Sequence, residues 1–190
     1  MAMRIIQPLI GTLEKWCSIN SYSARLYSLP YRKTVQREID LAGITSSDRV
    51  LNIGCGAVPF TAVYLSLLSG AEVCALDLDR EAVERARAYL KKKELPGRIQ
   101  VVEGDGALYT SHGFTAVVVA LQAEPKEDIL NNLFSWSPPG SRFVFRQPSP
   151  LYENHYDSLP AGYKPLDQVQ QNMKTFDRSL LFVKGRELIS

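Results

Sequence analysis

The residues best suited to chemistry begin in a short glycine-containing turn. This turn, Gly54-Cys55-Gly56, follows an apolar run and precedes Pro59. Glycine lacks a Cβ and takes positive φ readily, so the backbone at Gly54 and Gly56 can turn sharply and lie against a ligand. Proline suits the first turn of a helix, and the free amides at a helix start favour a carboxylate or another anion. The pattern predicts a strand, a tight turn and a helix that bind a nucleotide-like cofactor.

Two later positions add to this site. Asp77 ends a second apolar run about 20 residues beyond Gly54, and an acid at that distance typically binds ribose hydroxyls. A third apolar run, residues 99–103, ends in the turn Gly104-Asp105-Gly106. Ligands of parallel sheets lie at the carboxyl ends of the strands. We therefore expect the two turns and Asp77 to face one site.

The elements that must position these residues alternate along the chain. Apolar runs predicted as strands are separated by stretches predicted as helices, which is the pattern of a parallel sheet with both faces covered. The expected strands are 50–53, 71–76, 99–103, 117–121 and 142–145, and the expected helices are 32–42, 81–94 and 126–134. Residues 173–183 predict a closing hairpin that turns at Asp177-Arg178.

Three segments resemble the cofactor motifs of the class I S-adenosylmethionine-dependent methyltransferases: residues 50–56, Ala75-Leu76-Asp77 and Glu103-Gly104-Asp105. The resemblance implies a Rossmann-like α/β fold with a mostly parallel seven-stranded sheet, helices on both faces and a C-terminal antiparallel hairpin. It also implies S-adenosylmethionine as cofactor, with the first turn beside its methionine part, Asp77 on the ribose and Asp105 facing the adenine. The expected cofactor contacts are Asn52, Gly54, Cys55, Gly56, Asp77, Leu78, Gly104, Asp105, Gly106 and Gln122.

The first motif departs from the family at two positions. The family usually has an acid where Asn52 stands and often a third glycine where this chain has Val58. Asn52 can hydrogen-bond a water or an amino group, but it carries no charge to pair with the methionine ammonium. The alternative is a dinucleotide-binding unit for a nicotinamide cofactor, whose G-x-G-x-x-G fingerprint would need glycine in place of Pro59. We favour S-adenosylmethionine.

The N-terminal segment, residues 1–45, is expected to form a helical cap on a cofactor-binding domain that spans 46–190. Residues 4–20 place apolar side chains at three- and four-residue intervals, and this helical face would cover either the core or the same face of a second copy in a homodimer. In the resembled family the segment before the first strand commonly folds over the cofactor. Tyr27 and Tyr31 are therefore candidate substrate contacts, and aromatic packing explains them equally well.

Polar residues near the later strands supply the remaining candidates. Glu124 follows the fourth expected strand and Arg146 the fifth, at the edge where ligands bind. A loop over 147–165 carries Tyr152 and His155, and loops of that length are usually functional or disordered. Arg146 and Tyr152 are candidate substrate contacts, and Glu124, Tyr152 and His155 are candidate catalytic bases. A helix-start charge, packing and a solvated loop position explain the three bases equally well.

Composition excludes several classes of function. A net charge of +2 over 190 residues indicates little about partners, but the lack of a long basic block argues against nucleic acid. Three cysteines leave one unpaired, and none has metal-ligand spacing. No apolar run approaches the length of a membrane span, and the first residues lack the pattern of a secretion signal. We expect a cytoplasmic protein that binds a small-molecule acceptor, no metal and no membrane.

A narrower resemblance is to nicotianamine synthase. That family has a similar glycine-proline-threonine turn, here ending at Thr61, a Pro-Gly before the fifth strand, here Pro139-Gly140, and then an arginine, here Arg146. The resemblance spans about residues 44–184. It implies transfer of the aminocarboxypropyl arm of S-adenosylmethionine with release of methylthioadenosine. The family's helical N-terminal domain, which shapes its substrate tunnel, has no equivalent in residues 1–45.

Three hypotheses about function follow from these patterns. The first is an S-adenosylmethionine-dependent methyltransferase that acts on a small molecule, and the second is aminocarboxypropyl transfer. The third is a non-catalytic subunit that retains the fold, which Asn52 and the short cap favour. No covalent protein nucleophile is needed for the first two, because the carbons bound to a sulfonium are already electrophilic and the protein mainly has to position the acceptor.

Overall fold

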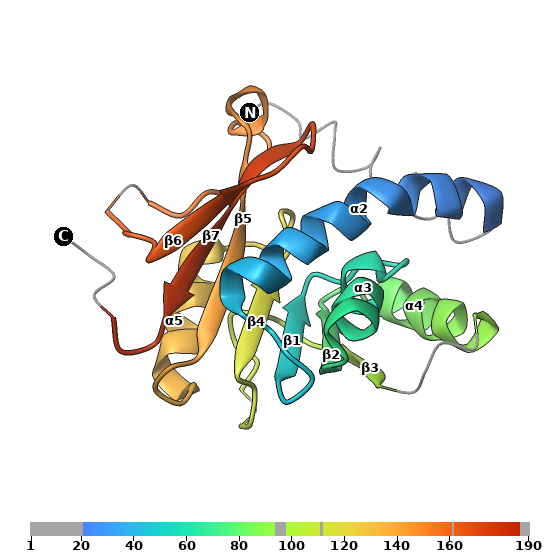
Figure 1. Cartoon of the computed structure of the whole chain (residues 1–190), viewed down its shortest axis with the longest axis horizontal. Coiled ribbons are helices and arrows are strands. Elements are labelled where there is room, and N and C mark those ends of the chain that lie inside the picture. Colours follow the sequence, from blue (N-terminus) through green and yellow to red (C-terminus); the bar gives the residue numbers. More distant parts are fainter. Residues whose placement is uncertain (1–20, 94–97, 111, 161, 187–190) are drawn as a thin grey trace.

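The structure is a computed structural model that describes residues 21–93, 98–110, 112–160 and 162–186. A seven-stranded sheet with the strand order β3-β2-β1-β4-β5-β7-β6 runs through it (Figure 1). The strands are β1 Arg49–Ile53, β2 Glu72–Asp77, β3 Ile99–Glu103, β4 Ala116–Val119, β5 Arg142–Pro148, β6 Asp167–Gln170 and β7 Phe176–Val183. Strands β1 to β5 are parallel, whereas β7 is antiparallel to β5 and to β6. This confirms the expected Rossmann-like methyltransferase fold.

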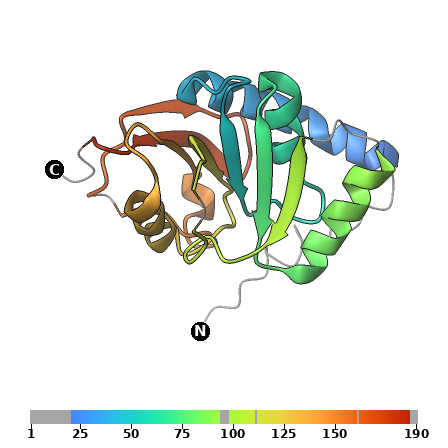
Figure 2. The same cartoon turned by 90° about the horizontal axis from the view of Figure 1, so that it is seen from below.

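Within the described residues, four α-helices cover the two faces of the sheet (Figure 2). They are α2 Ser21–Ala42, α3 Phe60–Ser69, α4 Arg80–Lys92 and α5 Lys126–Trp136. One apolar cluster packs α2, α3 and α4 on one face, where Val35, Leu65 and Val83 are fully buried. A second cluster packs α5 on the other face, around Leu130 and Phe143. Because both faces are covered, the central strands are apolar on both sides, which produced the continuous apolar runs in the sequence.

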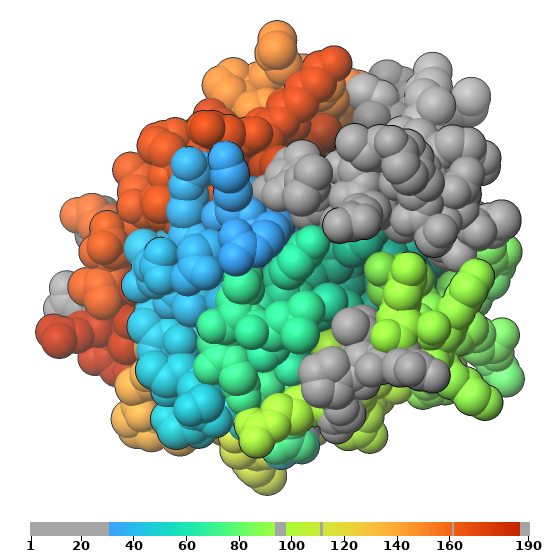
Figure 3. Space-filling model, turned by 45° about the vertical axis from the view of Figure 1, so that its right-hand side comes forward, coloured from blue at the N-terminus to red at the C-terminus, as the bar shows by residue number. Residues whose placement is uncertain are grey.

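Helix α2 is longer than the sequence indicates. Pro30 predicted a start near Arg32, because an interior proline costs a helix about 3 kcal/mol. The helix instead runs from Ser21 through position 30 to Ala42. It lies on the surface between α3 and the β6–β7 edge of the sheet (Figure 3), and Val35 and Ile39 enter the core. Tertiary packing thus overrides the local penalty. The helix expected over 4–20 lies outside the described residues.

The closing hairpin turns at a different place from the one predicted. Asp177 and Arg178 lie within β7, where Arg178 pairs with Gln147 of β5 and with Gln170 of β6. The chain reverses over residues 171–175, and the amide of Gln171 donates to the carbonyl of Asp177 (2.7 Å). The expectation of a turn at Asp177-Arg178 was wrong, because pairing with two neighbouring strands holds these polar residues in the sheet.

No described helix has the length and apolar character that a membrane span requires.

Candidate cofactor site

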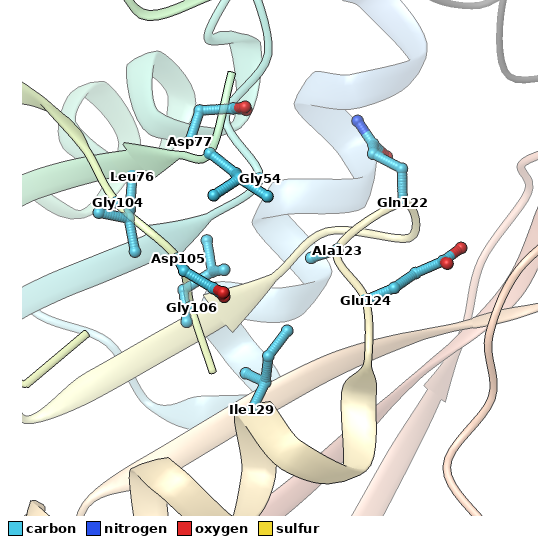
Figure 4. A pocket seen from close by; sticks show the side chains of 12 residues that line it. Gly54, Leu76, Asp77, Gly104, Asp105, Gly106, Gln122, Ala123, Glu124 and Ile129 are labelled. Carbon is cyan, nitrogen blue, oxygen red and sulfur yellow. The ribbon is translucent and has the colours of Figure 1, made fainter. Parts of the chain in front are cut away.

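A pocket opens at the carboxyl ends of β1 to β4 (Figure 4). Its empty space is about 570 Å³, open solvent at the mouth included. Gln122, Ala123 and Glu124 lie across the pocket from Gly104 and Asp105 (Figure 4). The expected cofactor residues that line it are Gly54, Asp77, Leu78, Gly104, Asp105, Gly106 and Gln122.

The first glycine turn needs its glycines for conformation and for space. Gly54 and Gly56 have φ of 78° and 68°, a region that other residues adopt only at a cost. The amide of Gly54 donates to the carbonyl of Leu76 (2.8 Å), which ties the turn to β2. A Cβ on Gly54 would lie 3.1 Å from that of Ala120. The turn therefore leaves its backbone open to a ligand at the pocket wall.

Asp77 is held in place by backbone amides. Its Oδ2 accepts from the amide of Gly56 (2.7 Å) and its Oδ1 from that of Asp79 (3.0 Å). Burial raises the pKa of Asp77, and the two amide hydrogen bonds oppose that shift. Each carboxylate oxygen has a further lone pair, so the group can still accept from ribose hydroxyls. The geometry fits the role that the sequence implies.

The second turn is also closely packed. Oδ1 of Asp105 accepts from the amide of Ala107 (2.9 Å), and the amide of Gly104 donates to the carbonyl of Asp77 (2.9 Å). A Cβ on Gly106 would lie only 2.6 Å from Cγ2 of Ile53. The turn thus places Asp105 beside the carboxyl end of β2, and Gly106 is a position where a side chain would not fit.

The charge of the pocket favours a cationic ligand. Asp77, Asp105 and Glu124 line it, and no lysine or arginine is among its described lining residues. Such a field attracts a sulfonium and opposes the pyrophosphate of a dinucleotide. The residues present therefore fit S-adenosylmethionine better than a nicotinamide cofactor.

A smaller hollow adjoins the other side of the glycine turn. It is lined in part by Tyr31, Thr61 and Arg146, and it shares Gly54 and Gln122 with the larger pocket. Cys55 also lines it, buried, with Sγ 3.6 Å from the carbonyl of Gly56. Two predicted substrate residues, Tyr31 and Arg146, are thus brought together beside the expected cofactor turn.

Arg146 belongs to a buried ion pair. Its Nε and one Nη donate to the two carboxylate oxygens of Glu38 (2.8 and 2.9 Å), and the same Nη reaches Oγ1 of Thr61 (3.1 Å). The hydroxyl of Ser179 donates to Glu38 as well (2.8 Å). Burial works against the charge, but Glu38 outweighs it and raises the pKa of Arg146. The pair joins α2, α3, β5 and β7.

Other predicted residues lie away from the two hollows. Asn52 is fully buried, and its Nδ2 donates to the carbonyl of Val118 (3.1 Å). It lines neither hollow, although its buried Oδ1 has no partner among the described residues. Tyr152, in a short 3-10 helix over Pro150–Tyr152, packs beside Tyr156 and Phe176, and His155 contacts its ring. For Tyr27 the structure describes only the backbone, within α2, and the prediction for its side chain stays untested.

Two residues with structural importance were not predicted. Glu38 shares a helical face with apolar Val35 and Ile39, and an acid on such a face is a signal for a buried partner. Lys126 is fully buried, and its Nζ donates to the carbonyls of Leu121 (2.7 Å), Ala123 (3.4 Å) and Asp157 (2.8 Å). Burial lowers the pKa of Lys126 to about 8. Its position in the first turn of a helix gave no signal of this role.

The sequence is similar to known transferases. A family model described as a methyltransferase domain matches residues 50–140. The L-histidine 2-aminobutanoyltransferase of Yersinia pestis is 30% identical over 132 residues, which are 68% of this chain and 49% of that protein. An enzyme of the same name from Pseudomonas aeruginosa strain UCBPP-PA14 is 40% identical over 68 residues, 36% of this chain and 26% of that protein. The chain thus spans half or less of the length of these relatives.

Solved structures share the fold. A variant of MtNAS in complex with S-adenosylmethionine matches with a TM-score of 0.82 at 20% identity, over 93% of this chain and 74% of that one. An RNA methyltransferase from Salinibacter ruber in complex with S-adenosyl-L-homocysteine matches with a TM-score of 0.66 at 18% identity, over 82% and 93%. Together with the matched domain and the acid-lined pocket, these likenesses identify S-adenosylmethionine as the cofactor. Residues 50–140 therefore form a methyltransferase domain, in a chain whose fold is shared with S-adenosylmethionine-dependent methyltransferases.

Proposed function

We propose that the protein transfers the aminocarboxypropyl arm of S-adenosylmethionine to a nitrogen atom of a small acceptor and releases methylthioadenosine. The observation that carries this proposal is the 132-residue match to a relative named for transfer of an aminobutanoyl unit to L-histidine. The methionine arm of the cofactor is a four-carbon amino acid unit of that kind.

The chain's own residues position the reactants. When bound, S-adenosylmethionine supplies a sulfonium whose attached carbons are electrophilic, and its sulfur becomes a neutral thioether when one of them is transferred. Asp77 and Asp105 would orient the nucleoside from two neighbouring strand ends, which brings the reacting atoms into a defined geometry. Glu124, at the pocket wall, is the lining carboxylate closest in sequence to the shared residue Gln122. We assign Glu124 as the group that would accept the proton that the attacking nitrogen loses.

Methyl transfer is the second candidate, and the match to a methyltransferase domain favours it. The two reactions use the same cofactor and the same pocket. They differ in which carbon next to the sulfur faces the acceptor, and therefore in which nucleoside leaves. The identity of that nucleoside decides between them.

The test is a reaction with S-adenosylmethionine and L-histidine, followed by mass spectrometry of both products. We expect methylthioadenosine together with histidine that carries the aminocarboxypropyl arm. Because S-adenosylmethionine slowly forms methylthioadenosine on its own, the histidine adduct is the decisive product, and the Asp77→Ala protein gives the background. S-adenosylhomocysteine with a methylated acceptor would replace the proposal by methyl transfer. Cofactor binding without turnover of histidine or of other amino acids and amines would contradict both.

A further inference from the structure

We propose that α5 fixes the two facing walls of the cofactor pocket through two positioning residues, Lys126 and Asn132. The walls are a turn after β3, residues 104–109, and a turn after β4, residues 121–124, which lie on opposite sides of the pocket (Figure 4). Each of the two side chains donates hydrogen bonds to backbone carbonyls of one turn. The proposal concerns cofactor binding and does not depend on which group of the cofactor is transferred.

The face of α5 that carries these residues also lines the pocket. Lys126, Ile129 and Asn132 follow one another at three-residue intervals, so each is a neighbour of the next on the helix surface. Ile129 is buried and lines the pocket between the two turns (Figure 4). A Cβ on Gly106 would lie 3.5 Å from Cγ1 of Ile129. This face of α5 therefore packs directly against the turn after β3.

Lys126 holds the turn after β4. Its side chain is fully buried, and Nζ donates to the carbonyls of Leu121 (2.7 Å), Ala123 (3.4 Å) and Asp157 (2.8 Å). An ammonium has three protons and no lone pair, so it matches these three acceptors. A Cβ on Gly54 would lie 3.3 Å from that of Ala123. Because the turn after β4 packs so closely against the glycine turn, a shift of either one changes the pocket.

Asn132 holds the turn after β3. Its Nδ2 donates to the carbonyls of Gly106 (3.1 Å) and Tyr109 (2.9 Å), which uses both protons of the side-chain amide. The same turn carries Asp105, which lines the pocket and is expected to face the adenine. Without the two hydrogen bonds the turn could move away from α5, and Asp105 would move with it.

The two walls offer different groups to the cofactor. The turn after β4 carries Glu124, whose charge attracts a sulfonium. The turn after β3 carries Asp105 on the adenine side. S-adenosylmethionine and S-adenosylhomocysteine share the adenine but differ at the sulfur, which is charged only in the first. A displaced Glu124 therefore changes the ratio of the two dissociation constants, whereas a displaced Asp105 changes both constants alike.

The first test is calorimetric titration of wild type and of Lys126→Met with both ligands. We expect the Kd of S-adenosylmethionine to rise about 3-fold or more relative to that of S-adenosylhomocysteine, because the loosened turn no longer holds Glu124 in place. Loss of the lysine charge by itself would strengthen the attraction for a sulfonium and lower this ratio. An unchanged or lowered ratio would therefore overturn the role of Lys126.

A control and a second variant accompany this test. Lys91→Met, at an exposed position of α4, makes the same substitution away from the pocket and should leave both dissociation constants unchanged. If Lys126→Met does not fold, Lys126→Gln gives the same comparison with a smaller rise, because its amide retains two N–H donors. The same criterion applies to it.

The second test repeats the two titrations on Asn132→Leu, which has a similar size but no donor. We expect both dissociation constants to rise about 5-fold or more, with their ratio unchanged. Asn131→Leu, one residue earlier and exposed, is the matched control. A folded Asn132→Leu protein that binds both ligands as wild type does would overturn the role of Asn132.

Both tests separate positioning from support of the fold. A loss of stability without these changes in binding would mean that the two residues support only the fold, and it would overturn the proposal. Because the tests measure binding alone, they stand even if the released nucleoside disproves the proposed reaction.

Discussion

The buried carboxylate of Asp77 is expected to bind the cofactor, but it lowers the stability of the unliganded protein. Its pKa is raised by burial, so between the ordinary carboxyl pKa and the raised value the folded state holds more protons than the unfolded state. Stability therefore falls as pH rises through that window, and the cost persists at neutral pH. A ligand whose hydroxyls donate to the carboxylate would offset it. The residue is suited to a site that is completed by its cofactor.

We predict that Asp77→Asn weakens S-adenosylmethionine binding about 10-fold or more, because an amide accepts fewer hydrogen bonds from the ribose than a carboxylate does. The change also replaces one carboxylate oxygen, which accepts from a backbone amide, by a donor NH2 group. Titration calorimetry measures the affinity. Asp128→Asn, at an exposed position of α5, is the control. Unchanged affinity for the cofactor would contradict the role of Asp77.

Gly106 is constrained by space. We predict that Gly106→Ala destabilises the protein by about 1–3 kcal/mol, because the new Cβ would lie 2.6 Å from Cγ2 of Ile53. Chemical denaturation measures this, with Gly162→Ala as control, since a Cβ at Gly162 meets nothing within 4 Å. A Gly106→Ala protein as stable as the control would mean that β1 and the second turn separate at little cost.

At the scale of elements, α2 is tied to the sheet at two points by the arginines of β5. Arg142 contacts its last carbonyl and Arg146 pairs with Glu38 inside the helix. The second pair is fully buried, so its desolvation cost is large and its loss would leave one buried charge alone. Thr61 of α3 and Ser179 of β7 also hydrogen-bond to the pair, so two further elements contact it.

We predict that Glu38→Gln costs about 3–5 kcal/mol of unfolding free energy, because it leaves Arg146 buried without a counter-charge. The double variant Glu38→Gln with Arg146→Met should be less destabilised than the sum of its single changes. A double-mutant cycle by denaturant unfolding measures the coupling. Additive effects would mean that the two side chains stabilise the fold independently.

The connection between β4 and α5 holds the loop after β5 through Lys126. Its pKa is lowered to about 8, so between about pH 8 and the ordinary lysine value the unfolded state binds more protons. Stability should therefore rise with pH across that window. We predict that Lys126→Met removes this part of the pH dependence. Denaturation at pH 7.5 and 9.5 for both proteins measures the difference, and parallel profiles would place the shift on another group.

Over the whole molecule, the sequence predicted what local motifs determine. The glycine turns, Asp77 and Asp105 were found because each motif combines a strand end with a turn, and the parallel order places those ends together. Glu38 and Arg146 were not paired in advance, because 108 residues separate them. The role of Lys126 depends on one carbonyl of a distant loop, and backbone carbonyls cannot be located from a pattern of side chains. The hairpin turn was predicted at the wrong position, because strand pairing keeps Asp177 and Arg178 within β7.

The partners of α2 also determine when this helix can dock during biosynthesis. The helix is translated early, but Glu38 meets Arg146 and Ser179 only after 108 and 141 further positions. During translation, Glu38 has no partner until Arg146 of β5 and Ser179 of β7 have been synthesised. Helix α2 therefore cannot complete its native contacts until β7 has left the ribosome. The long sequence separation favours slow docking of this helix after the central strands have paired. A nascent chain stopped before β7 would expose a surface suited to capture by a chaperone.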